Sequence, residues 1–279
     1  MIEIAPVAGA LGAEISGVDL ARFDDATFEK IRRAFTDHLV LFFHDQSLSP
    51  EDQVTLTRRF GPVLRVPYVA HLKEHPDIIA VLKEAEERQI STFGNAWHSD
   101  FSFLAEPPAG SLLYALEAPS YGGDTLWSNM YIAYEALSEG MRRMLEGLKA
   151  IHTGKPYGRQ GGVGITGSKS IQITRGDPEA DRETAHPVVR THPQSGRKAL
   201  FVNAIYTTRF EGMTEAESRP LLDFLFEHAI RPEFACRFRW TPGALAIWDN
   251  RCTLHYAVND YDGSRRLLHR TTFAGERPV

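Results

Sequence analysis

The chain has 279 residues, of which 43% are hydrophobic and 24% charged, and its 31 Lys plus Arg and 36 Asp plus Glu give a net charge of −5. This globular composition excludes collagen, coiled coils and long disordered proteins. The negative charge argues against a basic nucleic-acid or membrane surface, and two cysteines are too few for a disulfide framework. The first residues, with Glu3 and Glu14, resemble neither a signal peptide nor a membrane anchor. We therefore expect a cytoplasmic protein without nucleic-acid or membrane partners.

Short strands outnumber helices along the chain. The first predicted elements are strands at residues 2–5, 13–15 and 39–43 and helices at residues 25–38 and 49–60. Further strands are predicted at residues 78–82, 98–103, 110–117, 188–192 and 199–202. A helix at residues 214–230 is followed by predicted strands at residues 234–240, 244–248, 253–258 and 267–273. Ser49 and Thr214 begin capping boxes, which set the starts of the two later helices.

This element order indicates the fold class. Many short strands with little strand–helix alternation favour a mainly β protein, an antiparallel jelly roll with flanking helices, over a parallel doubly wound fold. We expect a single domain spanning residues 1–279. Residues 154–185 contain seven glycines in 32 residues and no periodicity. Such a segment predicts either a lid-like insertion or a disordered loop.

Three polar patterns could carry chemistry. His98 and Asp100 are two residues apart, so on a strand both would leave the same face and could bind a divalent metal. The same spacing occurs at His75 and Asp77, and an isolated pair of this kind is more often a solvated turn. Near the C-terminus, Arg266 and Arg270 would share one strand face. They are either surface residues or, if buried, partners of an anion.

Five segments, in order along the chain, resemble a known family. They are WHSD (residues 97–100), PSYGGDTLWSNM (119–130), HPVVRTHPQSGRKALFVN (186–203), WDNRCTLHYA (248–257) and RRLLHRTT (265–272). Together they resemble the iron(II)- and 2-oxoglutarate-dependent dioxygenases of the taurine dioxygenase and chlorophenoxyacetate dioxygenase superfamily, over essentially the whole chain. The resemblance implies a double-stranded β-helix, a jelly roll of cupin type.

The resemblance also implies a site. His98, Asp100 and His255 would bind Fe(II) as a facial triad, which leaves positions for 2-oxoglutarate and O2. Arg266 would bind the distal carboxylate of 2-oxoglutarate through two parallel hydrogen bonds, with Thr125 as its hydroxyl partner. The implied reaction couples decarboxylation of 2-oxoglutarate to succinate and CO2 with hydroxylation of a C–H bond.

The implied substrate is a small organic anion, with Arg270 as the partner of its acidic group. Where the taurine enzymes have a histidine before a proline, this chain has Val66, and where they have an asparagine four residues before the first metal ligand it has Gly94, with Asn95 one place later. Both changes remove polar groups. We therefore expect an apolar or aromatic body packed on Val66, Val69 and Tyr206, with Asn95 nearby.

Several segments are more similar to aryloxypropionate dioxygenases, which favours an aryloxyalkanoate-like or other apolar-bodied carboxylate. Alkyl sulfates and sulfonates such as taurine are the alternative. More distant alternatives are a jelly-roll metal hydrolase and a non-enzymatic binding protein. We also expect a homo-oligomer. The remaining side chains of interest are assigned to the core (Trp97, Trp127, Trp240, Trp248), to the surface (His71, His75) or to no role (His152, His186, His192, His269).

Overall fold

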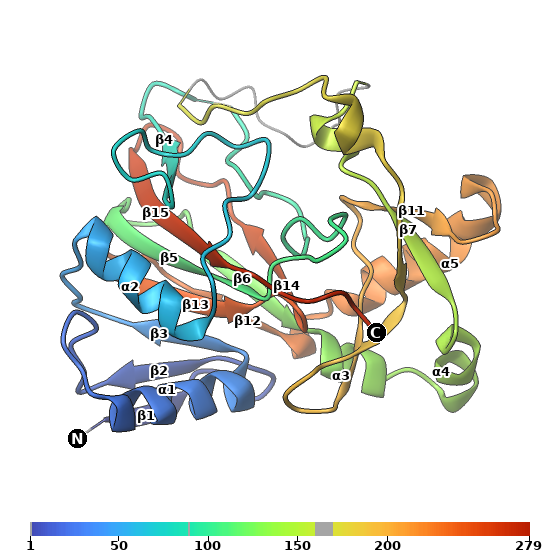
Figure 1. Ribbon diagram of the computed structural model, residues 1–279, viewed down its shortest axis with the longest axis horizontal. Helices are drawn as coiled ribbons and strands as arrows, with labels where there is room; N and C mark the ends of the chain where they lie inside the picture. Colours follow the sequence, from blue (N-terminus) through green and yellow to red (C-terminus); the bar gives the residue numbers. More distant parts are fainter. Residues whose placement is uncertain (1, 89, 160–169) are drawn as a thin grey trace.

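The largest sheet is the framework of the fold. The structure, a computed structural model, describes residues 2–88, 90–159 and 170–279. Seven strands lie in the order β1-β2-β3-β13-β5-β15-β4 (Figure 1). Their bounds are β1 Glu3–Pro6, β2 Ala13–Ser16, β3 Val40–Phe43, β13 Leu245–Asp249, β5 Gly110–Glu117, β15 Arg266–Phe273 and β4 Ile79–Lys83. Neighbours are antiparallel except β2 and β3, which are parallel.

A second sheet packs on one face of the first. It has the order β12-β6-β14. Its strands are β12 Ala235–Phe238, β6 Thr125–Asn129 and β14 Thr253–Ala257. The rings of Phe42 and Phe238 stack across the two sheets at 4.3 Å, and those of Trp127 and Trp248 are 5.9 Å apart. These two sheets form the jelly-roll core that the sequence predicted.

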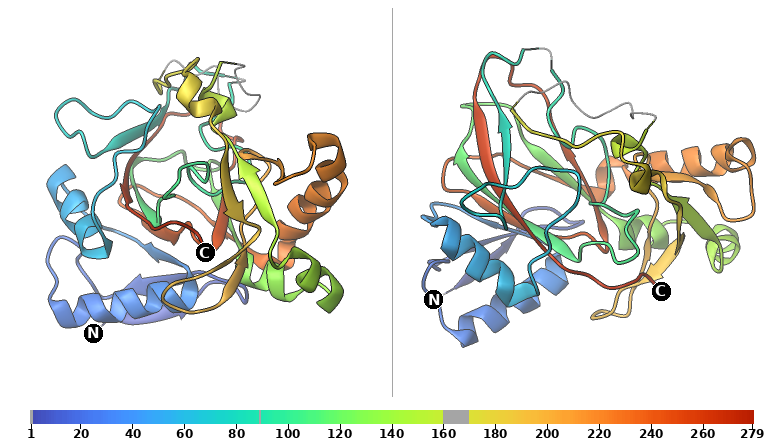
Figure 2. Two further views of the ribbon diagram at one scale, coloured as in Figure 1. Left: turned by 45° about the vertical axis from the view of Figure 1, so that its right-hand side comes forward. Right: turned by 45° about the horizontal axis from the view of Figure 1, so that its top comes forward.

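Two helices, α1 (Asp25–His38) and α2 (Pro50–Phe60), cover the opposite face of the large sheet (Figures 1 and 2). Strand β3 lies within the continuous apolar run at residues 39–43, and its two faces explain that run. Phe42 points into the core between the sheets, whereas Leu41 and Phe43 pack with Ile31 and Phe35 of α1. Successive strand residues face opposite sides, so a strand covered on both sides must be apolar throughout.

The remaining elements lie to one side of the jelly roll (Figure 2). Two small sheets, β11-β7-β8 and β10-β9, are found there. Their strands are β7 Lys149–His152, β8 Thr184–Pro187, β9 Val189–Thr191, β10 Lys198–Leu200 and β11 Thr207–Phe210. The helices are α3 Met130–Glu135, α4 Glu139–Leu145 and α5 Glu215–Ala229, with short 3-10 turns η1 Lys155–Tyr157, η2 Pro178–Asp181 and η3 Pro232–Phe234. The capping boxes at Ser49 and Thr214 are both present.

Part of the predicted insertion is well packed. Within residues 154–185, Tyr157, Ile171 and Ala180 are buried, and the ring of Tyr157 stacks on that of Phe101 at 5.8 Å. Residues 160–169 of the predicted lid lie outside the described residues. In the described part of the chain, no helix is long and apolar enough to cross a membrane.

One predicted strand is wrong. Residues 98–103 form an isolated bridge at His98 followed by a turn. Phe101 has a left-handed backbone, with φ of 45°, and its carbonyl accepts a hydrogen bond from the amide of Leu104. A strand cannot continue through that conformation. His98 and Asp100 therefore do not share a face through strand periodicity, although the fold still brings them together.

Candidate active site

Two histidines face each other where a loop crosses the edge of β14. The backbones of His98 and His255 exchange both amide–carbonyl hydrogen bonds, at 3.1 and 2.8 Å, and their imidazole rings are 4.2 Å apart. The Nδ1–H of His98 donates to the carbonyl of Ala96 at 2.6 Å. This bond fixes the tautomer and leaves Nε2 of His98 free as a ligand atom.

Asp100 reaches the same point from the turn. The Ser99 hydroxyl donates to the carbonyl of Asn250 at 2.7 Å, which ties the turn to the loop between β13 and β14. Oδ1 of Asp100 lies 3.6 Å from Nε2 of His98 and 3.6 Å from Nε2 of His255. One ligand atom from each of the three buried residues lies within 4.8 Å of the others. Two imidazoles and a carboxylate on one side form the donor set of a facial triad, so these residues fit Fe(II).

The other carboxylate oxygen of Asp100 is held separately. Nη2 of Arg270 lies 2.6 Å from Oδ2 of Asp100, and the Ser111 hydroxyl donates to the same oxygen at 3.2 Å. Burial raises the pKa of Asp100, but the guanidinium of Arg270, aided by His255 and His98, outweighs burial and holds the pKa well below its usual value. The carboxylate is therefore ionised, with Oδ1 directed at the histidines.

The protonation state of His255 is set by burial and by a neighbouring imidazole. Burial, reinforced by the nearby His98, lowers the pKa of His255 well below its ordinary value. The imidazole is therefore neutral at physiological pH, the form that binds metal.

A second arginine occupies the other end of the pocket. Arg266 is 3% exposed, and among the described residues its Nε and Nη2 have no hydrogen-bond partner. Its guanidinium lies near the ring faces of Trp240 and Tyr261, at 5.8 and 5.9 Å. Burial lowers the pKa of Arg266, and the neighbouring Tyr261 and Asp124 oppose this shift only in part. A buried guanidinium with unused donors fits an anion such as the distal carboxylate of 2-oxoglutarate.

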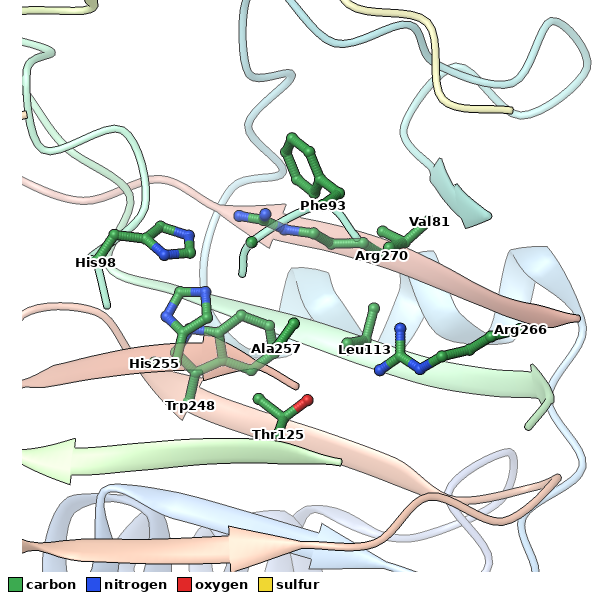
Figure 3. A pocket seen from close by; sticks show the side chains of 11 residues that line it. Val81, Phe93, His98, Leu113, Thr125, Trp248, His255, Ala257, Arg266 and Arg270 are labelled. Atoms are coloured by element: carbon green, nitrogen blue, oxygen red, sulfur yellow. The ribbon is translucent and has the colours of Figure 1, made fainter. Parts of the chain in front are cut away.

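The pocket itself joins these groups. Figure 3 shows the imidazoles of His98 and His255 at one end, the guanidinium of Arg266 at the other, and the hydroxyl of Thr125 below them. The full lining comprises Val81, Phe93, Gly94, His98, Leu113, Thr125, Trp248, His255, Ala257, Arg266 and Arg270. The mixture of two cations, a metal-type donor set and apolar walls suits a small anion with an apolar body.

The other predicted substrate-binding residues do not line this pocket. In the described part of the chain, Val66, Val69, Asn95 and Tyr206 are absent from this lining. Val66 and Val69 are buried in the main core cluster. The Tyr206 ring lies 6.4 Å from that of His98, and its hydroxyl is 3.3 Å from the Tyr157 hydroxyl. Tyr206 therefore lies beside His98, one of the predicted metal ligands.

Two residues beside the site, Ser111 and Trp240, are not predicted from the sequence to belong to it. Ser111 is a small polar residue inside a predicted strand, with no local pattern to connect it to Asp100. Trp240 was assigned to the core, where it is indeed buried, but its indole also contacts the pocket residue Thr125. Trp127 and Trp248 are buried in the core, as predicted, whereas Trp97 is only partly buried and packs against the core.

A second buried cluster, His192, Asp249 and Cys252, also groups three possible ligands. Its polar atoms are occupied by protein. Nε2 of His192 bonds Oδ2 of Asp249 at 3.0 Å, and Arg251 donates to both oxygens of the same carboxylate. This cluster therefore serves as a structural ion-pair network.

Comparison with known proteins agrees with this geometry. Residues 3–272 match the family model described as taurine catabolism dioxygenase TauD, TfdA family. An alpha-ketoglutarate-dependent sulfate ester dioxygenase of Pseudomonas putida is 36% identical over 100% of this chain and 91% of its own. The (S)-phenoxypropionate/alpha-ketoglutarate-dioxygenase of Sphingobium herbicidovorans is 31% identical, covering 98% of this chain and 95% of its own. The crystal structure of a taurine dioxygenase from Burkholderia xenovorans matches with a TM-score of 0.83 and 34% identity, over 100% of this chain and 92% of that chain.

The chain belongs to the TauD/TfdA family. It is a 2-oxoglutarate-dependent dioxygenase. The three comparisons name sulfate esters, a phenoxypropionate and taurine as substrates of the related proteins, so family membership does not by itself select among these substrate classes.

Proposed function

We propose that this dioxygenase uses Fe(II) bound by His98, Asp100 and His255 to hydroxylate a small organic anion with an apolar body. The observation that carries the proposal is the convergence of these three buried ligand atoms within 4.8 Å. His98 and His255 line the same pocket as Arg266, whose Nε and Nη2 have no hydrogen-bond partner among the described residues. Bound Fe(II) would supply the oxidative decarboxylation of 2-oxoglutarate and the oxidation of the substrate C–H bond.

The chain's own residues would perform the positioning. Arg266 and Thr125 hold the distal carboxylate of 2-oxoglutarate. Arg270 uses Nη2 to fix Asp100, while its Nε, which has no partner among the described residues, can meet the acidic group of the substrate. The walls formed by Phe93, Leu113 and Ala257 exclude water from the reacting groups.

The apolar walls support the preferred substrate class. Gly94 lines the pocket without a side chain, so no polar group from this position meets the substrate. Each Å2 of apolar surface buried contributes roughly 25 cal/mol, whereas an unmet polar group costs about 1 to 3 kcal/mol. An aryloxyalkanoate or another apolar-bodied carboxylate therefore fits better than taurine, whose ammonium group would lose its polar partners.

A sulfate ester is the second candidate. The 36% identity to the Pseudomonas putida sulfate ester dioxygenase favours it, and the same physical arguments apply because an alkyl sulfate also joins an anion to an apolar chain. The two candidates differ in the acidic group that Arg270 would receive.

A substrate panel tests the proposal. Succinate release is measured with an aryloxypropionate, an alkyl carboxylate and an alkyl sulfate of matched chain length, and taurine, each corrected for release without substrate. The variant His255→Ala is the control for metal-dependent turnover. We expect apolar-bodied anions to stimulate succinate release well above taurine. Taurine exceeding every apolar-bodied acid would overturn the proposed substrate class.

A further inference from the structure

We infer that Trp240 is a positioning residue for 2-oxoglutarate, because its indole N–H turns the hydroxyl proton of Thr125 toward the co-substrate. This inference deepens the proposed function, since it rests on Arg266 and Thr125 forming the co-substrate anchor. Trp240 lies outside the pocket lining and would act through Thr125.

The contact is a buried hydrogen bond between Thr125, the first residue of β6, and Trp240, which lies just beyond the end of β12. Nε1 of Trp240 donates to Oγ1 of Thr125 at 2.9 Å, and the two residues are 1% and 3% exposed. Phe238 pairs with Thr125 at the end of the β12–β6 ladder. Trp240 follows two residues beyond Phe238, so the sheet brings the indole and the hydroxyl together.

The chemistry of the two groups fixes the direction of the bond. An indole N–H can only donate, whereas a hydroxyl carries one donor proton and two acceptor lone pairs. Thr125 must therefore accept from Trp240, and its own proton remains available for another acceptor. Among the described residues this indole is the one side-chain partner recorded for Oγ1 of Thr125, and the hydroxyl lines the pocket on the side of Arg266 (Figure 3).

Trp240 also supports the other half of the anchor. The guanidinium of Arg266 lies 5.8 Å from the Trp240 ring and 5.9 Å from the Tyr261 ring. The Thr92 hydroxyl is 2.8 Å from that of Tyr261, which ties this second aromatic wall to the body of the protein. One tryptophan thus orders both donors, through its N–H for Thr125 and through its ring face for Arg266. Nε and Nη2 of Arg266 have no partner in the part of the chain that the structure describes, and together with the Thr125 proton they would form a three-donor receptor for a carboxylate.

The experiment measures 2-oxoglutarate binding to Mn(II)-loaded protein by calorimetry, so no turnover is needed. Trp240→Phe keeps an aromatic ring and removes the N–H. Trp127→Phe is the matched control, because Trp127 is also fully buried and its Nε1 has no partner among the described residues. Thr125→Val and the double variant Trp240→Phe/Thr125→Val complete a cycle, and thermal melting confirms that each variant is folded.

We expect Trp240→Phe to raise the Kd for 2-oxoglutarate about 2- to 12-fold, which corresponds to the loss of one neutral hydrogen bond. The Kd of the control Trp127→Phe should stay within about twofold of the wild-type value. Thr125→Val should raise it about 10- to 150-fold, and adding Trp240→Phe to it should have little further effect. A Kd for Trp240→Phe equal to that of wild type, or an equal loss in both backgrounds, overturns the inference while the co-substrate site stands. Wild-type protein that binds no 2-oxoglutarate overturns the co-substrate site and the inference together.

Discussion

Nη2 of Arg270 lies 2.6 Å from Oδ2 of Asp100, and both side chains are buried. The arginine expected to receive the substrate therefore also fixes the carboxylate proposed as a metal ligand. Removing the side chain that hydrogen-bonds to a metal ligand commonly lowers metal affinity by about 10- to 100-fold. Under the proposed function, substrate recognition and metal binding would therefore share the side chain of Arg270.

We predict that Arg270→Leu weakens metal binding about 10- to 100-fold. Without the guanidinium, burial raises the pKa of Asp100, and protons then compete with the metal for the carboxylate. Titration of Mn(II) into the apoprotein measures the effect. Arg265→Leu, at a partly exposed arginine paired with Glu84 and Glu117, is the control. Equal metal affinity in Arg270→Leu and wild type would show that Asp100 needs no such support.

Arg266→Lys should weaken 2-oxoglutarate binding about 10- to 150-fold while metal affinity changes little. Lysine keeps the charge but loses the paired donors, which costs roughly 1.5 to 3 kcal/mol for a charged hydrogen bond. The neighbouring Arg265→Lys supplies the matched control, since Arg265 bonds Glu84 and Glu117 outside the pocket. An unchanged Kd in Arg266→Lys would move the anchor to another cation.

Gly94 offers a test of substrate selection. A Cβ built there would lie 3.5 Å from Cε1 of His98 and 3.8 Å from Cβ of Ala257, so a side chain fits, although φ of +84° strains residues other than glycine and, to a lesser degree, asparagine. Gly94→Asn should lower kcat/KM for apolar-bodied anions about 5- to 150-fold, through a polar group left unpaired in the pocket, and should raise turnover of taurine. Gly94→Ala adds a side chain at the same positive φ without the amide, and it should not gain taurine activity. Identical substrate profiles for the two variants would remove Gly94 from the selection of substrate.

The sequence predicts those parts of the fold and site that depend on local pattern. The apolar run at residues 39–43 becomes the doubly covered strand β3, and strand periodicity places Arg266 and Arg270 on one buried face of β15. The turn after His98 could not be foreseen, because its conformation depends on Phe101 and on contacts with Asn250, which is 151 residues from Ser99. The sequence does not predict the role of Ser111 either, because its hydrogen bonds with Asp100 and Arg270 depend on the tertiary fold.

A buried histidine pair predicts acid sensitivity. Burial, with smaller effects of neighbouring charges, lowers the pKa of His152 to about 3 and that of His186 to about 4. Since unfolded histidine titrates near 6.5, the unfolded state binds more protons below that pH, and stability is lost as pH falls from about 6.5 toward 4. When the pH is lowered from 7 to 5, each of the two histidines should reduce the free energy of unfolding by roughly 2 kcal/mol. Urea unfolding at the two pH values measures this loss.

Substitution of His152 tests whether the buried histidine pair causes the loss of stability at low pH. His152→Gln should reduce the difference in unfolding free energy between pH 7 and pH 5, because it removes one of the two buried imidazoles. The same pH difference in His152→Gln and wild type would mean that other groups control the acid sensitivity.

We expect His98, Asp100 and His255 to bind Fe(II) at the place where 2-oxoglutarate also binds. The most direct test is the visible absorption of the Fe(II)-loaded protein under argon during titration with 2-oxoglutarate. Wild-type protein should develop a weak visible charge-transfer band that saturates at one equivalent per chain, and His255→Ala should show none under the same conditions. A band of equal intensity in His255→Ala, or its absence from iron-loaded wild-type protein, would contradict the assignment of this site.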